Sequence, residues 1–353
     1  MAAAIALRQS GFRVVVADGA HPPIDKACGE GFLPDGVAAL QGLRIRVPAD
    51  ESWVFRGIRF RSGELSADAA FPESSCGLAV RRISLHRLMV ERAEQTGAEL
   101  LWGSPVTGIS AHGVRLGDRF VRARWIIGAD GAHSRVRRWA GLDHSFRPRL
   151  RYAFRQHFRV APWTEYMEVY WGERCQGYAT AVSREQVCVA LVSHDPKLRL
   201  EDGLKSLPGL RMRLQGAEIV SAERGALTGN RQFRRVWRDN VVLIGDASGT
   251  VDAITGEGIG LAFSQAMALA HSLQSGNLDA YQREHRKLAL RPKWMARLML
   301  TMDRRPKLQQ HTLRVFQKRP EIFQRLVEFH VGILPPSQLV REGLNIGWEL
   351  LTT

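Results

Sequence analysis

The segment 241–260 constrains the fold more than any other part of the chain. It reads VVLIGDASGTVDAITGEGIG, a short apolar run followed by Gly245, Asp246 and a series of glycines. Such a run is typical of a strand buried on both faces of a parallel sheet. A strand of this kind delivers Asp246 to the carboxyl edge of the sheet, where α/β proteins bind their ligands. We therefore expect an α/β fold with a ligand site at this edge.

The residues after this strand are suited to a flat, hydroxyl-bearing ligand. The Asp246 carboxylate can accept hydrogen bonds from ligand hydroxyls, and Gly256 and Gly258 allow the backbone to approach closely. A long helix is predicted from about Gly258, and its first turn would offer free N–H groups and a positive dipole end. An ordinary strand–loop–helix with turn glycines is the alternative, but the length of the pattern favours a ligand site.

A second acidic segment lies upstream. Residues 121–128 predict a strand that runs into Gly128-Ala129-Asp130-Gly131, and a basic helix start follows. An Asp-Gly turn after a strand is common, so this pattern is weak alone. Between the two acidic segments, residues 166–171, 177–182 and 186–193 predict successive strands with polar turns, typical of an antiparallel sheet. This order indicates a second domain inserted into the α/β domain.

The first residues predict the second half of a βαβ unit. Residues 2–10 favour a helix that ends at Gly11, and residues 12–18 favour a buried strand that ends at Asp18. Further elements are predicted as helices at 35–43 and 82–96 and strands within 53–80 and at 98–102. From about residue 281 the pattern is helical and basic, and we expect the prolines at 292, 306, 320, 335 and 336 to break it.

Charge and cysteine content exclude several classes of protein. The net charge of +15 comes mostly from arginines that are scattered rather than clustered, and no nucleic-acid-binding motif is present. An arginine-rich, solvated surface is the simplest explanation, so we expect no nucleic-acid partner. The cysteines (Cys28, Cys76, Cys175 and Cys188) form no CxxC pair, so neither a disulfide framework nor a metal site is expected. No apolar stretch approaches the ~20 residues of a membrane span, and the start lacks signal-peptide features; we expect a cytoplasmic location.

Four segments together resemble a known family. They are Gly245-Asp246, Asp130-Gly131, the arginine-led helix start at Arg81–His86, and the TGEGI sequence at Thr255–Ile259. With these segments the chain resembles the flavoprotein monooxygenases of the p-hydroxybenzoate hydroxylase type, and within them the geranylgeranyl reductase-like branch. The resemblance covers roughly residues 1–290 and implies an FAD-binding, Rossmann-type, three-layer domain.

The resemblance also implies a domain division and a cofactor site. The FAD-binding domain would comprise residues 1–50, 81–150 and 236–290, the substrate domain residues 51–80 and 151–235, and residues 291–353 a helical C-terminal region. In the family, Asp246 would contact the ribityl chain, Asp18 the adenosine ribose, and Arg82 the flavin phosphates. The residues expected to bind cofactor are Asp18, Arg82, Asp130, Gly131, Gly245, Asp246, Gly256, Gly258 and Ile259.

The implied function is that of an FAD-dependent oxidoreductase with NAD(P)H as electron donor. Reduced flavin would either activate O₂ to hydroxylate an aromatic substrate or reduce a double bond in a lipid or prenyl-like small molecule. Cys28 lies in a loop that resembles the one reaching the isoalloxazine in the reductase branch; a small buried thiol is the alternative. No residue is predicted to be catalytic, because His157, His194 and Tyr178 are more simply explained as structural.

Two departures from the family pattern stand out. The family opens with a strand and a GxGxxG turn, whereas this sequence begins inside the helix that follows them. A start codon assigned too late or a shortened pseudo-enzyme would explain this, and we expect the chain as written to bind FAD weakly or not at all. The sequence GYATA at 177–181 only partly matches the GYxWxFP strand of the reductase branch, so the substrate class stays open.

A non-catalytic function is the alternative to an enzyme. The sequence RPKWMARLML at 291–300 places Lys293, Trp294 and Arg297 beside apolar residues, which suits a helix lying on a lipid surface. Under this alternative the chain is a relic of the flavoprotein fold that binds peripherally at the inner membrane surface. A helix packed on the FAD-binding domain explains the same residues.

Overall fold

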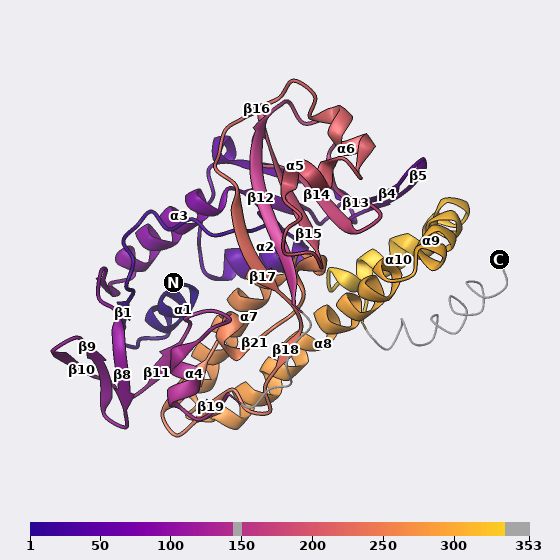
Figure 1. The fold of residues 1–353 in the computed structure, drawn as a ribbon. Helices are drawn as coiled ribbons and strands as arrows, with labels where there is room; N and C mark the ends of the chain where they lie inside the picture. The colour runs from indigo at the N-terminus through magenta and orange to yellow at the C-terminus, as the bar shows by residue number, and fades with distance from the viewer. Residues whose placement is uncertain (144–149, 336–353) are drawn as a thin grey trace.

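The computed structural model describes residues 1–143 and 150–335. Figure 1 shows an α/β part that contains the N-terminus, a long-stranded sheet beside it, and a C-terminal group of helices that lies along the sheet. Among these described residues, no helix is long and apolar enough to cross a membrane. The sequence expectation of an α/β fold with an added, largely antiparallel sheet and a helical C-terminal region is confirmed.

Short parallel strands form the centre of the α/β part. Strand β1 (Val15–Ala17) pairs in parallel with β7 (Glu99–Leu101). Strand β11 (Ile126–Gly128) pairs in parallel with β20 (Val241–Leu243), and β19 (Trp237–Arg238) adds to β20 in antiparallel fashion. All three residues of β20 are buried, as the apolar run in the sequence predicts.

Helices supply the rest of this hydrophobic core. They are α1 (Ala2–Gln9), α2 (Pro34–Gly42), α3 (Arg82–Gln95) and α7 (Gly258–Gln274). Helix α1 is almost entirely alanine and aliphatic in its first two turns, and residues 2–7 are all buried. Helices α2 and α7 meet at Gly36 and Gly260, where a Cβ on Gly260 would lie 3.0 Å from the Gly36 Cα. The missing side chains let these two backbones touch.

The largest sheet has eight strands in the order β16–β12–β15–β14–β13–β4–β5, with β17 also paired to β12. They are β4 (Gly57–Ser62), β5 (Leu65–Ala70), β12 (Arg151–Arg159), β13 (Tyr166–Trp171), β14 (Cys175–Ala181), β15 (Gln186–Ser193), β16 (Glu218–Ile219) and β17 (Arg224–Thr228). The predicted antiparallel pairing holds for β12 to β15, but β4 joins β13 in parallel. Thus a segment from before α3 extends the sheet formed after β11.

Three smaller sheets surround these parts. Strands β8 (Val106–Ser110), β9 (Gly113–Leu116) and β10 (Arg119–Arg122) form an antiparallel meander. Strands β3 (Ser52–Phe55) and β2 (Gly31–Phe32) both pair with β6 (Gly77–Val80), and β18 (Arg231–Gln232) pairs with β21 (Gly249–Thr250). The prediction of one strand over 121–128 is therefore wrong at its start, because residues 119–122 close the meander and the buried strand begins at Ile126.

Three short helices and three 3-10 turns complete these parts. They are α4 (Arg135–Trp139), α5 (Leu200–Leu204), α6 (Pro208–Arg213) and the 3-10 turns η1 (Ala49–Glu51), η2 (Gly245–Ser248) and η3 (Ala253–Thr255). Helices α5 and α6 cover one face of the large sheet and share a small core with it. The C-terminal helices cover the other face.

The C-terminal helices α8 (Leu278–Asp303), α9 (Pro306–Lys318) and α10 (Pro320–His330) share an apolar core with the large sheet. Pro306 and Pro320 begin helices, where a missing N–H costs nothing. The expectation that Pro292 breaks the helix is wrong, because α8 runs through it with the ring buried. Burial of the surrounding apolar residues offsets the cost of about 3 kcal/mol for an interior proline. Pro336 and the rest of 336–353 lie outside the described residues.

Candidate cofactor and substrate site

Asp246 lies at the carboxyl edge of the parallel strands, as predicted. Strand β20 ends at Leu243, Gly245 takes a left-handed conformation (φ 56°), and Asp246 follows in η2. Solvent reaches the carboxylate, yet protein atoms surround it closely enough that desolvation raises its pKa, opposed by Lys26. Within the described ranges it has no hydrogen-bond partner. A recessed carboxylate with free lone pairs is ready to accept hydroxyl donors.

The first turn of α7 is open where a ligand would approach. Gly256 has φ 70°, which favours glycine, and a Cβ placed on Gly256 or Gly258 would meet nothing within 4 Å. No side chain caps the N-terminus of α7. Because α7 is 17 residues long, its first N–H groups and its dipole form a fixed partial positive charge beside this space. Ile259, also predicted here, is half-buried in the same turn.

Cationic and donor groups without partners lie at the start of α3. Arg82 is half-buried. Among the residues that the structure describes, its buried Nη1 atom and Nδ1 of the buried His86 have no hydrogen-bond partner. Desolvation and the charge of Arg82 lower the pKa of His86 to about 4, so this imidazole is neutral at physiological pH. Lys26 acts on both His86 and Asp246, which shows that the loop before β2 lies near both.

The predicted residues Asp18 and Asp130 stand in different situations. Asp18 is exposed after β1 and accepts a hydrogen bond from the Ala20 N–H at 2.9 Å. Asp130 accepts from the Ser134 hydroxyl and from the N–H groups of Arg135 and Val136 (2.7 and 3.1 Å), so it caps α4. Its carboxylate is therefore occupied within its own turn, and Gly131 (φ 78°) completes that turn. Cofactor contacts by these residues stay predictions.

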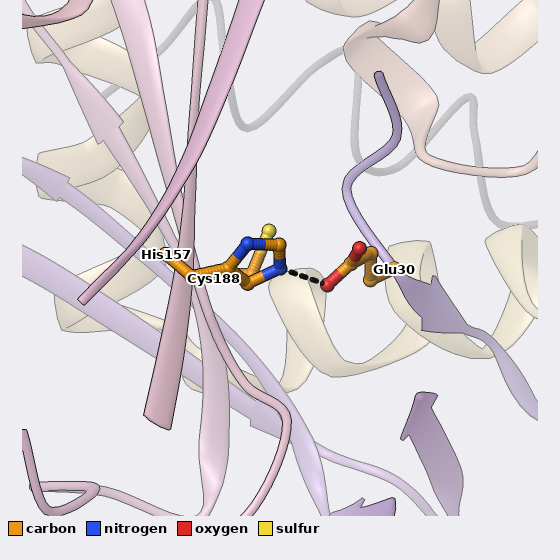
Figure 2. A group of neighbouring side chains, drawn as sticks. All are labelled: Glu30, His157 and Cys188. Carbon is orange, nitrogen blue, oxygen red and sulfur yellow. Dashed lines mark hydrogen bonds and ion pairs between the residues drawn. The ribbon is translucent and has the colours of Figure 1, made fainter. Parts of the chain in front are cut away.

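A buried polar cluster joins the loop before β2 to the large sheet (Figure 2). Glu30 is 2% exposed and takes φ 63°, a strained conformation for a residue other than glycine. Its Oε2 lies 2.6 Å from Nε2 of His157, and its Oε1 accepts from the Arg82 N–H at 2.8 Å. Glu30 thus connects the start of α3 to strand β12. Sequence reasoning missed it, because a glutamate between two glycines carries no signal of burial.

The same cluster contains the thiol of Cys188. The Glu30, His157 and Cys188 ligand atoms lie within 4.8 Å of one another, and such residues bind zinc elsewhere. Here the carboxylate is already hydrogen-bonded on both oxygens, and the buried Arg155 guanidinium lies 3.9 Å from Glu30 Oε1. A metal ion would face that cation. We therefore describe the cluster as an ion-pair and hydrogen-bond network.

Cys28 lies in the same loop. It is half-buried, and its Sγ accepts a hydrogen bond from the Glu30 N–H at 3.2 Å. Desolvation, with Glu30 adding to it, raises the pKa of the thiol to about 11, so Cys28 is not a thiolate at neutral pH. All four cysteines of the chain are free thiols.

Two cavities border the TGEGI segment. An apolar cavity lies between the large sheet and helices α8 and α10, lined by Ile58, Phe60, Met167, Val169, Met295 and Met299 among others. Tyr178, Thr255 and His330 also line it, and the Tyr178 hydroxyl donates to the Ile254 carbonyl at 3.1 Å. A more polar cavity lies between α2, α7 and α8, where Asp35, Glu257, Ser264 and Arg291 contribute to the lining.

Of His157, His194 and Tyr178, the candidate general bases from the sequence, only Tyr178 lines one of the two cavities described above. Its pKa is raised by desolvation, so it is protonated at neutral pH. His157 is occupied by Glu30 and by the Ser221 hydroxyl at 2.8 Å. His194 is 46% exposed at its side chain and lies 3.6 Å from Asp303. The sequence analysis did not predict His330 or Glu257 as site residues. His330 lies in a helix beyond the family-like motifs, and in the segment around Glu257 only the neighbouring residues Gly256, Gly258 and Ile259 were predicted to bind cofactor.

These features fit FAD. The open space over Gly256 and Gly258 would admit a flat ring system. Unpartnered buried atoms of Arg82 and His86 are suited to phosphate oxygens, and the recessed Asp246 carboxylate is suited to ribityl hydroxyls. Each feature leaves a polar group or a volume without a partner in the protein itself, as a bound ligand requires.

The sequence profile of a family described as FAD binding domain matches residues 3–290. The digeranylgeranylglycerophospholipid reductase of Methanosarcina acetivorans is 28% identical over 245 residues, 62% of this chain and 59% of that protein. The menaquinone reductase of Mycobacterium tuberculosis is 29% identical over 314 residues, 78% and 74% of the two chains. The chain thus spans less than two thirds of the first relative.

Among solved structures, a flavoprotein/dehydrogenase from Cytophaga hutchinsonii superimposes with a TM-score of 0.80 at 19% identity, covering 94% of this chain and 90% of that one. At this identity the likeness shows the fold. The superposition covers the large sheet as well as the α/β part, because it includes nearly the whole chain.

Proposed function

The chain belongs to the FAD binding domain family, and from this we propose that it is an FAD-dependent reductase that saturates a carbon–carbon double bond in an apolar, prenyl-like substrate. The observation that carries the substrate class is the apolar cavity beside the TGEGI segment. It is lined by aliphatic, aromatic and methionine side chains from the sheet and from α8 and α10. The named reductase relatives support the same reaction class.

We infer the following arrangement for the cofactor. Gly256, Gly258 and the start of α7 would receive the flavin ring, Asp246 the ribityl chain, and Arg82 the phosphates. When bound, FAD supplies two-electron transfer, with NAD(P)H as the proposed electron donor. The protein's contribution is to hold that group at the border of a dry cavity.

The apolar cavity would orient the substrate and exclude water. Met167, Met295 and Met299 have flexible thioether side chains that repack easily, which suits a ligand larger than the closed cavity. Tyr178 is the polar group on the sheet side, and its protonated hydroxyl can donate to a substrate oxygen at the cavity end. Cys28 is held as a thiol in the loop before β2.

Consumption of reduced nicotinamide with and without O₂ tests this function. The FAD-loaded protein is mixed with NADH or NADPH and a prenyl chain of the geranylgeranyl type, and the product is analysed by mass. We expect consumption without O₂ and a gain of two hydrogens per reduced bond. Consumption that requires O₂ and adds one oxygen to an aromatic substrate would replace the reductase with a hydroxylase. A chain that binds lipid vesicles but no flavin would favour the non-catalytic alternative.

A further inference from the structure

Glu257 and His330 meet at the border between the two cavities. Ile254 and Thr255 line the apolar cavity, and the next residues, Gly256 and Glu257, line the polar one. His330, from the last turn of α10, lines the apolar cavity. Its Nδ1 lies 3.4 Å from Glu257 Oε2. The two side chains therefore form a contact from one cavity to the other.

The hydrogen bond of His330 to the backbone fixes its tautomer. Its Nε2 lies 3.2 Å from the Thr255 carbonyl oxygen, which can only accept, so Nε2 carries the hydrogen. In a neutral imidazole Nδ1 is then a bare acceptor, and it faces the Glu257 carboxyl. A proton on Glu257 is the one that can fill this contact. In the ordinary ionised state of Glu257, an acceptor would face an acceptor.

Burial favours the neutral forms of both groups. The Glu257 and His330 side chains are only 4% and 7% exposed, and neither Glu257 oxygen has a hydrogen bond among the described residues. An ionised carboxylate in that position would lack the hydrogen bonds that make burial tolerable. Desolvation and the nearby Asp35 raise the pKa of Glu257 well above its ordinary value, against the opposing effect of Arg291 and the Thr255 hydroxyl. Desolvation with the Arg291 charge lowers the pKa of His330 to about 3.

The charged groups around the pair balance each other. From α2, Asp35 forms an ion pair with Arg291 of α8, and Arg291 Nη2 also lies 3.8 Å from Glu257 Oε1. With Glu257 protonated and His330 neutral, the four groups sum to zero. The sum is also zero if the proton moves from Glu257 to His330. A proton can therefore cross between them without a change in the charge of the cluster.

We propose that Glu257 and His330 form a proton relay that carries a proton from the polar cavity into the apolar cavity. The outer end is accessible, because the side chains of Asp35 and Arg291 are 36% and 26% exposed. A proton enters at the Glu257 carboxyl, passes to Nδ1 of His330, and leaves from Nε2, whose hydrogen points at present to the Thr255 carbonyl. Glu257 then regains a proton from solvent in the polar cavity.

This inference rests on the proposed function, which requires such a proton. Saturation of a double bond adds a hydride to one carbon and a proton to the other; the hydride, with both electrons, comes from reduced flavin. The relay supplies the proton, which breaks the His330 N–H bond as the new C–H bond forms. Apart from Tyr178 and Thr255, whose hydroxyls donate to the Ile254 and Asp252 carbonyls, the cavity residues named above offer no other donor on this side.

Spectroscopy of the folded chain without substrate tests the proton positions. Infrared spectra should show the carbonyl stretch of a protonated carboxyl that shifts in D₂O and is lost in Glu257→Gln. Glu168→Gln is the matched control, because Glu168 is equally buried but its oxygens accept from Arg61, Trp163 and Tyr170. Nitrogen NMR of labelled histidine, assigned with His330→Gln, should show neutral His330 with hydrogen on Nε2. An ionised Glu257, or a doubly protonated His330 at neutral pH, would overturn the proposal.

Turnover then tests the relay itself. Glu257→Gln and His330→Gln should each lower kcat by about 100-fold, as loss of a general acid does, with KM and flavin content nearly unchanged. Both should also reduce transfer of deuterium from solvent into the product. Normal kcat in either variant would sink the relay. A parent chain that turns over no prenyl-like substrate would instead count against the proposed function, and the spectroscopic result would stand by itself.

Discussion

Glu168 in the large sheet and the polar groups at the starts of α3 and α7, the edge proposed to face the cofactor and called here the cofactor-facing edge, are buried in opposite surroundings. In the sheet, Glu168 is fully buried, and its two oxygens accept from Arg61, Trp163 and Tyr170 at 2.6–2.8 Å. At the cofactor-facing edge, Arg82, His86 and Glu257 have buried polar atoms that form no hydrogen bond within residues 1–143 and 150–335. Buried polar groups whose hydrogen bonds are all formed within the protein stabilise the fold. Buried polar groups that lack partners are expected where a ligand or a proton supplies the missing hydrogen bond.

Replacement of Glu168 by alanine is expected to have the largest effect on stability. It leaves the buried donors of Trp163 and Tyr170 and the Arg61 guanidinium without their acceptor. Breaking a buried charge network of this kind costs about 3–5 kcal/mol. Urea denaturation measures the loss in the free energy of unfolding. A change in the free energy of unfolding below about 1 kcal/mol would show that the hydrogen-bond network around Glu168 does not stabilise the fold.

At the cofactor-facing edge, Gly258→Leu should leave the fold intact and weaken FAD binding about 100-fold, about 2.7 kcal/mol. The new side chain would occupy the open space at the start of α7. Gly108→Leu is the matched control, since a Cβ there also meets nothing within 4 Å, but on β8. Fluorescence titration with FAD measures both variants. Equal FAD affinities of Gly258→Leu and Gly108→Leu would show that the flavin does not bind at the start of α7.

Buried histidines should make the cofactor-facing part sensitive to acid. Desolvation lowers the pKa of His285, which contacts the Ser248 hydroxyl at 2.8 Å, from 6.5 to about 4. The folded state therefore binds fewer protons than the unfolded state between these values. The stability that neutral His285 contributes is complete above pH 6.5 and is lost as the pH falls towards 4.

The variant His285→Gln isolates this contribution. It should flatten the fall in the free energy of unfolding between pH 6.5 and 4 by about 3 kcal/mol, given 1.36 kcal/mol per pKa unit. Denaturant titrations at several pH values provide the measurement. An unchanged slope in the variant would mean that His285 is already protonated in the folded protein.

The sequence predicted the elements of the site better than its side-chain contacts. Apolar runs and glycines predicted β20, the place of Asp246 after it and the start of α7, because these depend on local residues. The parallel pairing of β4 with β13 and the pairing of Glu257 with His330 depend on segments far apart in the chain. Pro292 was misjudged because local propensity favours a break, whereas packing against the sheet decides in favour of a continuous helix.

Titration of the Asp246→Asn variant with FAD tests the central claim most directly. Asp246 has no hydrogen-bond partner in the part of the chain that the structure describes, so its charge should matter for the ligand and not for the fold. We predict FAD binding about tenfold weaker than in the parent chain, about 1.4 kcal/mol, with an unchanged or slightly higher Tm, because desolvation of the carboxylate is relieved. Because the titration compares the FAD affinities of the variant and the parent chain, it remains informative if the parent chain binds FAD weakly. A variant that binds FAD as the parent does, or that loses stability instead, would contradict the account.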